Sequence, residues 1–287
     1  MIELIGAILC SAVLFLIFRL FPKFQVDTAQ AIVFNYFTAF ICGSFVSGSL
    51  PSISGLIASN LLPWILLCGF LFISIFIAMG ISSQKNGMGT TSVAVKMSLA
   101  ISALAFVFIH NEAITWLKIV GFILSIVGVL MITLEKSEEK GNTSSLLLLL
   151  FIFVGSAGLD VVLNVIKQYF AKGYPDSLFT AFGFLAAGTL GIIWLSTEFI
   201  RKKRKFHFRN ILAGIILGVP NYFSIFFLVR SYETAGWSNA SVLAIMNISI
   251  VALAAIFGMI IFKESARLQK LTGLIAVVAA ILCLTVN

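Results

Sequence analysis

The chain has 287 residues, of which 60% are hydrophobic and 10% charged, with a formal net charge of +8 and a mean hydropathy of +1.11. This composition excludes a water-soluble globular domain and indicates a chain whose solvent is the lipid bilayer. The basic residues lie mostly in connectors too short to form a nucleic-acid-binding domain, so we expect no nucleic-acid partner.

The apolar residues form ten runs, each close to the roughly 20 residues that a helix needs to cross a bilayer. In chain order the runs cover residues 2–20, 29–48, 62–83, 89–110, 116–134, 145–169, 177–197, 210–229, 238–262 and 269–286. They are continuous, whereas the strands of a membrane barrel would alternate in polarity. The sequence therefore predicts an all-α polytopic membrane protein with ten transmembrane helices.

One unit of this pattern occurs twice. Residues 110–123 reappear as residues 262–275, and a shift of 149 residues aligns further positions earlier in the chain. The matched pairs include Glu112 with Glu264, Lys118 with Lys270, Gly121 with Gly273, Gly87 with Gly236 and Ser92 with Ser241. Repetition within a strongly hydrophobic chain is typical of secondary transporters, whose halves move around a site at their interface.

The repeat divides the chain into a first five-helix repeat over 1–134, a connector over 135–144 and a second five-helix repeat over 145–287. Because five is an odd number, the second copy enters the membrane in the opposite sense from the first. We therefore predict that the two repeats are inverted.

Each repeat carries a short turn with a glutamate between its last two helices, Asn111-Glu112-Ala113 in the first and Lys263-Glu264-Ser265 in the second. Together with the ten spans, these turns make the chain resemble the drug/metabolite transporter superfamily, particularly its EamA-type members. That family commonly has Gly before this Glu, and this chain lacks the Gly in both turns. The resemblance implies transport and leaves the cargo open, because members export amino acids, metabolites or drugs, import sugars or exchange nucleotide sugars.

Two roles fit Glu112 and Glu264. A carboxylate at the start of a helix favours the positive end of the helix dipole and accepts hydrogen bonds from free backbone N–H groups, which is a structural role. The alternative is a gating ion pair with a nearby basic residue.

Basic residues predict the orientation, since Lys and Arg accumulate in cytoplasmic loops. The densest cluster is Arg201, Lys202, Lys203, Arg204 and Lys205 with Arg209, and the connectors on its side hold fourteen Lys and Arg against four on the other. We expect the loop over 201–209 to be cytoplasmic and both termini to be non-cytoplasmic, in a bacterial inner (plasma) membrane.

Ionisable residues inside a span are costly and usually face the bundle interior or a wet cavity. Lys96 lies within the fourth run, one helical turn beyond Ser92, and we expect both to face a polar cavity. The alternative is that the Lys96 side chain extends to the cytoplasmic interface.

Asp160 lies in the middle of the sixth run, on a polar stripe with Ser156, Asn164 and Lys167. Such a stripe turns toward water or other helices, and helix-to-helix hydrogen bonding without transport is the alternative role. Asp160 is the candidate for proton or cation coupling. Helix rise puts Lys96 and Asp160 roughly 9 Å apart in depth, which argues against direct neutralisation and leaves room for a water or substrate group between them.

Further polar groups are candidates for substrate contact. Pro220 in the eighth run predicts a kink beside Asn221 and Tyr222, whose alternative roles are kink repair and aromatic packing. Asn35 and Tyr36 in the second run and Asn247 in the ninth complete the set of candidates, which is Lys96, Ser92, Asn35, Tyr36, Asp160, Asn164, Asn221, Tyr222 and Asn247.

We predict a secondary transporter that works by alternating access and exports a small metabolite, such as an amino acid or a drug-like compound, with proton coupling as an option. An importer or exchanger of sugar-type or other metabolites is the alternative. The chain has two histidines, no metal-binding spacing and no phosphate-cradling glycine loop, so we expect no enzyme activity, metal or cofactor. The expected partners are a small-molecule substrate and the lipid bilayer, with a homodimer left open. An intramembrane enzyme and a channel are the less favoured classes.

Overall fold

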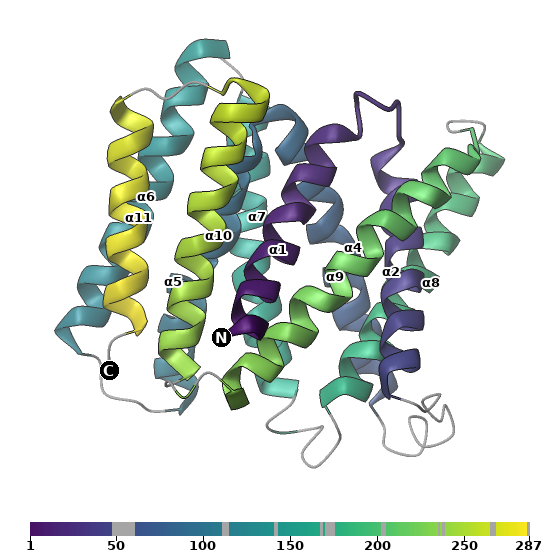
Figure 1. The fold of residues 1–287 in the computed structure, drawn as a ribbon, viewed down its shortest axis with the longest axis horizontal. Coiled ribbons are helices and arrows are strands. Elements are labelled where there is room, and N and C mark those ends of the chain that lie inside the picture. Colours follow the sequence, from purple (N-terminus) through teal and green to yellow (C-terminus); the bar gives the residue numbers. More distant parts are fainter. Residues whose placement is uncertain are drawn as a thin grey trace. The chain divides into compact units, whose positions relative to one another are not determined.

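The computed structural model is all-helical (Figure 1). It describes residues 1–47, 61–110, 115–140, 143–166, 169, 176–201, 205–234, 236, 239–264 and 268–285. Within these residues the helices are α1 (Ile2–Leu20), α2 (Thr28–Ser47), α4 (Leu62–Lys85), α5 (Met88–His110), α6 (Trp116–Lys140), α7 (Thr143–Val165), α8 (Asp176–Ile200), α9 (Phe208–Thr234), α10 (Asn239–Phe262) and α11 (Leu268–Thr285).

Each helix falls on one of the ten predicted runs, which confirms the all-helical architecture. The ends differ by a few residues, and the largest difference is at α6, which continues to Lys140 instead of stopping near residue 134. Hydropathy marks the limits of the apolar stretch, whereas the hydrogen-bonded helix continues into the polar segment. Among the residues that the structure describes, seven helices are long and apolar enough to cross a membrane: α1, α2, α4, α7, α8, α9 and α10.

The helices gather into two compact units. Unit 1 comprises residues 1–19, 78–161 and 224–287, and unit 2 comprises residues 20–77 and 162–223. Each unit therefore takes helices from both halves of the sequence. The units follow packing, so they do not coincide with the predicted repeats, which follow sequence similarity.

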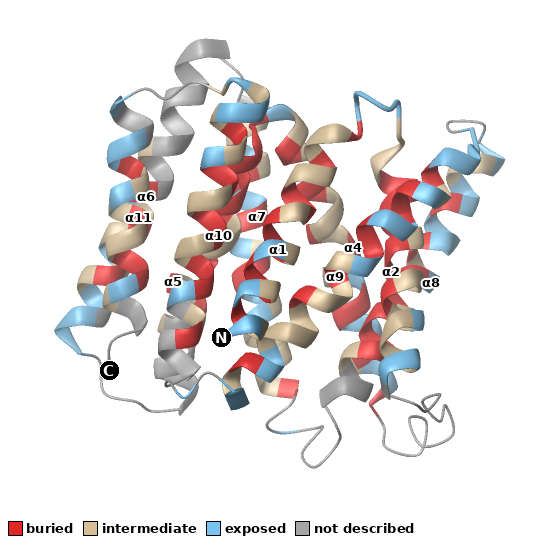
Figure 2. Cartoon of the chain, in the orientation of Figure 1, coloured by how far each residue is buried: buried red, intermediate tan, exposed pale blue. Residues whose placement is uncertain are grey.

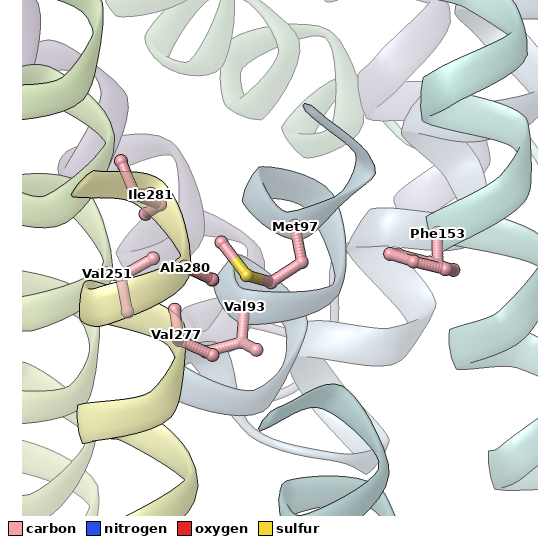
Figure 3. Close-up of a cluster of buried hydrophobic side chains, with 7 residues drawn as sticks. All are labelled: Val93, Met97, Phe153, Val251, Val277, Ala280 and Ile281. Atoms are coloured by element: carbon pink, nitrogen blue, oxygen red, sulfur yellow. The ribbon is translucent and has the colours of Figure 1, made fainter. Parts of the chain in front are cut away.

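Within unit 1, α6 packs along α11 and α5 packs against α10 (Figure 1). In both pairs the two helices occupy the same place in the two predicted repeats. Buried side chains from four helices form the apolar centre of the unit, shown in Figure 3: Val93, Met97, Phe153, Val251, Val277, Ala280 and Ile281. Dispersion contacts in such a cluster, together with close helix approach, replace the hydrophobic effect as the source of cohesion within a bilayer.

Within unit 2, α2 packs against α8, again a pair from equivalent places in the two predicted repeats. Small residues on α9 permit a close approach to α2: a Cβ on Gly214 would lie 2.6 Å from the carbonyl oxygen of Ala31, and one on Gly218 would lie 2.7 Å from that of Asn35. This spacing of two glycines four residues apart is a common device for packing membrane helices.

Large apolar side chains remain exposed along the lengths of the helices, including Ile5 and Leu9 on α1 and Ile215 and Ile216 on α9. Figure 2 shows exposed positions at many levels of the helices, not only at their ends. In water such surfaces would promote aggregation, whereas in a bilayer they contact lipid chains.

The turn between α4 and α5 is held from two sides within unit 1. At the end of α4, the Arg19 guanidinium donates from Nη1 to the carbonyl oxygen of Ser83 at 3.1 Å and to that of Gln84. At the start of α5, the backbone N–H of Met88 donates to Glu264 Oε1 at 3.0 Å. A cation therefore satisfies helix-end carbonyls and a carboxylate satisfies a helix-start donor, which complements both helix dipoles.

Glycines make room for the Glu264 carboxylate. A Cβ on Gly258 would lie 2.7 Å from Glu264 Oε2, and a Cβ on Gly87 would clash with the same carboxylate. Gly87 also has φ +90°, a conformation that residues with a side chain rarely adopt. Its repeat partner Gly236 has φ +70° but no described atom within 4 Å of an added Cβ.

These two glycines provide a matched test. We expect Gly87→Ala to lower thermal stability more than Gly236→Ala, because both pay about 1–2 kcal/mol for the left-handed backbone but only Gly87→Ala also displaces the Glu264 cap, worth about 1 kcal/mol more. The measurement is the melting temperature of the purified chain in detergent, followed by size-exclusion chromatography. Equal losses for the two variants would contradict this role of Glu264.

Candidate functional site

An opposed pair of charges lies in unit 1, contributed by Lys96 of α5 and Asp160 of α7. The two side chains interact electrostatically, and both belong to the described part of the chain, where no direct ion pair joins them. Lys96 is half-buried and Asp160 retains an exposed surface. The arrangement is thus a pair of opposite charges that compensate each other without direct contact.

Ser102 is the third member of this group. Its hydroxyl oxygen lies 3.4 Å from Asp160 Oδ2, and also 3.3 Å from the Leu99 and 3.2 Å from the Ser98 carbonyl oxygen of its own helix, so one hydrogen is shared among three acceptors. Ser102 is not among the site residues predicted from the sequence. A signal was present, because Ser98 and Ser102 stand one turn apart beyond Lys96 on α5, but which helix would face them was not visible in the sequence.

The separation in depth expected between Lys96 and Asp160 is compatible with their interaction. Asp160 lies level with Ser102, roughly 9 Å along α5 from Lys96 at 1.5 Å of rise per residue. A lysine side chain is long and flexible enough to carry its ammonium much of that distance. The length of the Lys96 side chain therefore offsets the difference in depth between the two backbones.

Asn247 of α10 lies at the same level of unit 1. Gly89 of α5 faces Ala255 of α10, and Val93 shares the apolar cluster with Val251, so the two helices run antiparallel. Continuing this register by one turn places Asn247 opposite the part of α5 that follows Lys96. Asn247 is buried, 5% exposed, and makes no hydrogen bond with another described side chain.

Two other predicted residues have local roles or neighbours. The Ser92 hydroxyl is buried and donates to the Gly89 carbonyl oxygen at 2.8 Å, so its hydrogen is used within α5. Asn164 follows Asp160 by one turn of α7 and is half-buried, but the division between the two units falls between them. Lys167, at the end of the predicted stripe, lies outside the described residues.

In unit 2, the neighbouring residues Asn35 and Tyr36 differ in the hydrogen bonding of their side chains. Tyr36 is 1% exposed, donates its hydroxyl to the Phe72 carbonyl oxygen at 2.8 Å and packs among Phe76 and Phe184. Asn35 is fully buried, and neither its amide nitrogen nor its amide oxygen has a partner among the described residues. An unpaired buried amide costs about 1–3 kcal/mol, so Asn35 is the better candidate for contact with a water or a substrate hydroxyl.

The segment of α9 around Pro220 also lies in unit 2. Pro220 stands inside the helix, Asn221 is 6% exposed, and both Asn221 and Tyr222 already interact with other residues. The Tyr222 ring lies against α2 at Gly43, where an added Cβ would be 3.0 Å from it. Helix packing is therefore part of what Tyr222 does.

The repeated glutamates have separate outcomes. Glu112 lies outside the described residues. The Glu264 carboxylate accepts from the backbone N–H of Met88 at the N-terminus of α5, a helix far from it in the sequence. Among the described residues, no group of three or more His, Cys, Asp or Glu side chains is placed to hold a metal ion.

Comparison with known proteins adds a functional context. No family model matches the chain. It is 29% identical to a Haemophilus influenzae protein described as uncharacterized, over 98% of this chain and 97% of that protein. It is also 29% identical to the glucose uptake protein GlcU of Bacillus subtilis, over 69% of each chain, and 27% identical to a probable glucose uptake protein GlcU of Bacillus cereus, over 70% and 71%. Both of these GlcU relatives are described as uptake proteins.

The compensated charge pair predicts a coupling energy that a double-mutant cycle measures. We expect Lys96→Met and Asp160→Asn each to lower stability, because each leaves one charge uncompensated, and the double variant to recover part of the loss. Since Asp160 is exposed and no direct contact joins the pair, the coupling should be about 1 kcal/mol, below the 3–5 kcal/mol lost when a dry buried pair is broken. The measurement is thermal unfolding in detergent, and strictly additive losses would exclude the coupling.

Proposed function

We propose that the chain is a secondary transporter that takes up a small neutral metabolite of the sugar type. The observation that carries the proposal is the compensated pair of Lys96 and Asp160 with Ser102, set in an all-helical chain with membrane-spanning character. An intramembrane ionisable pair marks a substrate or ion pathway more often than it stabilises a fold.

The charge balance of the pair favours a neutral solute. A charged substrate would leave one net charge in a low-dielectric site, whereas a sugar hydroxyl can accept from the Lys96 ammonium and donate to the Asp160 carboxylate. Asn247, level with the pair, offers an amide that both donates and accepts. In unit 2, the unpartnered amide of Asn35 is a further proposed hydroxyl-binding group.

The direction of transport is proposed as uptake. The relatives described as glucose uptake proteins favour the sugar importer over the exporter of amino acids or drug-like compounds that the sequence first suggested. Identity below 30% leaves the individual sugar open, so the proposal names the class of solute, a neutral polyhydroxylated molecule.

We extend the proposal to the architecture, with two inverted five-helix repeats as in the EamA-type transporters that the sequence resembles. Three observations support it. Equivalent helices pair within the units, α6 with α11, α5 with α10 and α2 with α8; α5 and α10 run antiparallel; and Gly87 and Gly236 share a left-handed backbone. Alternating access between such repeats is the proposed transport cycle.

The proposed orientation has the loop over 201–209 in the cytoplasm. Within unit 1 the end of α1, the α4–α5 turn and the end of α10 meet at Arg19 and Glu264. Within unit 2 the α1–α2 loop meets the α8–α9 loop at Asp27 and Asn210. Both groupings join connectors that ten alternating spans would put on one side, which supports the assignment.

The transport prediction is tested by uptake of labelled glucose and other neutral sugars into proteoliposomes. Wild-type protein should give saturable uptake, and Lys96→Met, Asp160→Asn and Ser102→Ala should reduce it, the charge variants by at least about tenfold because one lost charged hydrogen bond is worth about 1.5–3 kcal/mol. Ser125→Ala is the matched control, because the Ser125 hydroxyl is equally buried and also contacts a carbonyl of its own helix, that of Phe122, whereas no described carboxylate accepts from it.

Proteoliposomes preloaded with labelled amino acids or sugars test transport in the opposite direction, as efflux. Efflux of amino acids without transport of any neutral sugar would reject the uptake proposal, and full sugar uptake by both charge variants would reject the site.

Asp160 is also the proposed proton carrier. We expect Asp160→Asn to keep residual sugar exchange between equal concentrations but to lose accumulation driven by an inward proton gradient, because an amide cannot take up and release the proton. The measurement compares counterflow with gradient-driven uptake, and a protonophore should abolish only the second. Accumulation by Asp160→Asn under the proton gradient would remove Asp160 from the coupling.

A further inference from the structure

A second polar site lies in unit 2, apart from the charge pair. A pocket with a volume of about 450 Å³ opens where the α1–α2 loop meets the α8–α9 loop. It is lined by Gln25, Val26, Asp27, Glu198, Lys205, His207, Arg209 and Asn210. In the sequence, the basic residues of this segment indicate only which side of the membrane is cytoplasmic.

Buried hydrogen bonds hold the walls of this pocket together. Asn210 is fully buried, accepts from the Asp27 backbone N–H at 3.0 Å and donates to Gln30 Oε1 at 2.8 Å. Gln30 in turn donates from Nε2 to the Lys205 carbonyl oxygen at 2.8 Å. The two loops are therefore fixed to each other, and the pocket is a built feature of unit 2.

Basic and aromatic residues alternate along the chain beside the pocket. Lys205, His207 and Arg209 line the pocket, whereas the intervening Phe206 and Phe208 do not. Phe206 is 55% exposed and Phe208 is 74% exposed. The segment thus places basic residues at the pocket and leaves the two aromatic residues between them outside it.

The location matches the interface of a bilayer. The pocket lies at the start of α2, at the start of α9 and at the last turn of α8, where apolar helices end. Phe24 in the neighbouring loop is also exposed, at 61%. Exposed rings beside cations at the ends of membrane helices suit the boundary where lipid phosphates meet acyl chains.

We propose that this pocket binds the headgroup of an acidic phospholipid that carries hydroxyl groups, such as phosphatidylglycerol. Lys205 and Arg209 provide the cations for the phosphodiester, and a hydrogen bond from Arg209 Nη1 to Gln25 Oε1 at 3.1 Å orients the guanidinium while leaving other N–H donors.

The two carboxylates of the wall fit the same ligand. Asp27 Oδ1 accepts the Gln30 backbone N–H at 3.0 Å and so caps α2, and Glu198 lies near the end of α8. A mixed wall of cations and carboxylates disfavours a bare, multiply charged anion. It favours a singly charged phosphodiester whose glycerol hydroxyls donate to carboxylate oxygens.

Native mass spectrometry of the full-length chain in detergent tests this proposal. Phosphatidylglycerol and phosphatidylcholine with the same acyl chains are added to wild-type protein and to Lys205→Gln/Arg209→Gln. We expect wild type to retain phosphatidylglycerol preferentially and the double variant to bind it about 25-fold more weakly, from about fivefold for each lost cation. The matched control is Lys23→Gln/Arg201→Gln, which removes the same charge from exposed positions outside the pocket.

Each outcome decides the proposal. Equal loss of phosphatidylglycerol from the control, or equal retention by the pocket variant, would overturn it. Displacement of the lipid by millimolar glycerol phosphate would assign the pocket to a free phosphate ester instead. If the double variant does not run as a single species in chromatography, Lys205→Gln alone decides, because the hydrogen bond shown for Lys205 uses its backbone carbonyl; we expect a fivefold loss, and unchanged binding would overturn the proposal.

Discussion

A bilayer core offers no solvent for hydrogen bonds, so each polar or charged group that this chain carries into it needs a partner within the protein or along a wet path. Within each helix the backbone N–H and C=O groups hydrogen-bond to one another. The groups that need other partners are the backbone groups at helix ends and a few polar side chains. Arg19 and Glu264 satisfy the two ends that meet at the α4–α5 turn. Lys96 and Asp160 satisfy each other electrostatically inside unit 1.

The same constraint separates polar groups that stabilise the fold from polar groups that are available to a substrate. Tyr36 and Ser92 use their hydroxyl hydrogens on nearby carbonyls, and Glu264 accepts from the start of α5, so these groups are explained by the fold. The charge pair with Ser102 retains an exposed carboxylate, and the Asn35 amide has no partner among the described residues. Transport substrates meet a protein through groups of this second kind, which is why the functional proposal is built on them.

Small residues connect packing with polarity in both units. Gly214 and Gly218 bring α9 against the backbone of α2, and Gly258 and Gly87 leave space for a carboxylate that a methyl group would displace. Because lipid chains are as apolar as the core, close approach and dispersion contacts take the place of hydrophobic burial in holding the helices together. The hydrogen bonds among Asp27, Gln30 and Asn210 fix two loops to each other at the helix ends. The polar pocket between these loops is the proposed site for an acidic phospholipid headgroup.

The sequence by itself determined the helices, because a span must be continuous, apolar and about 20 residues long, and these properties are local. It also selected Lys96 and Asp160, since an ionisable residue within a span is visible without coordinates. It could not determine that Ser102 joins the pair, that the Tyr36 hydroxyl has a partner while the Asn35 amide has none among the described residues, or that Glu264 caps α5. Those outcomes depend on which helix faces which, on side-chain reach and on the space left by distant glycines, and only the tertiary structure decides them.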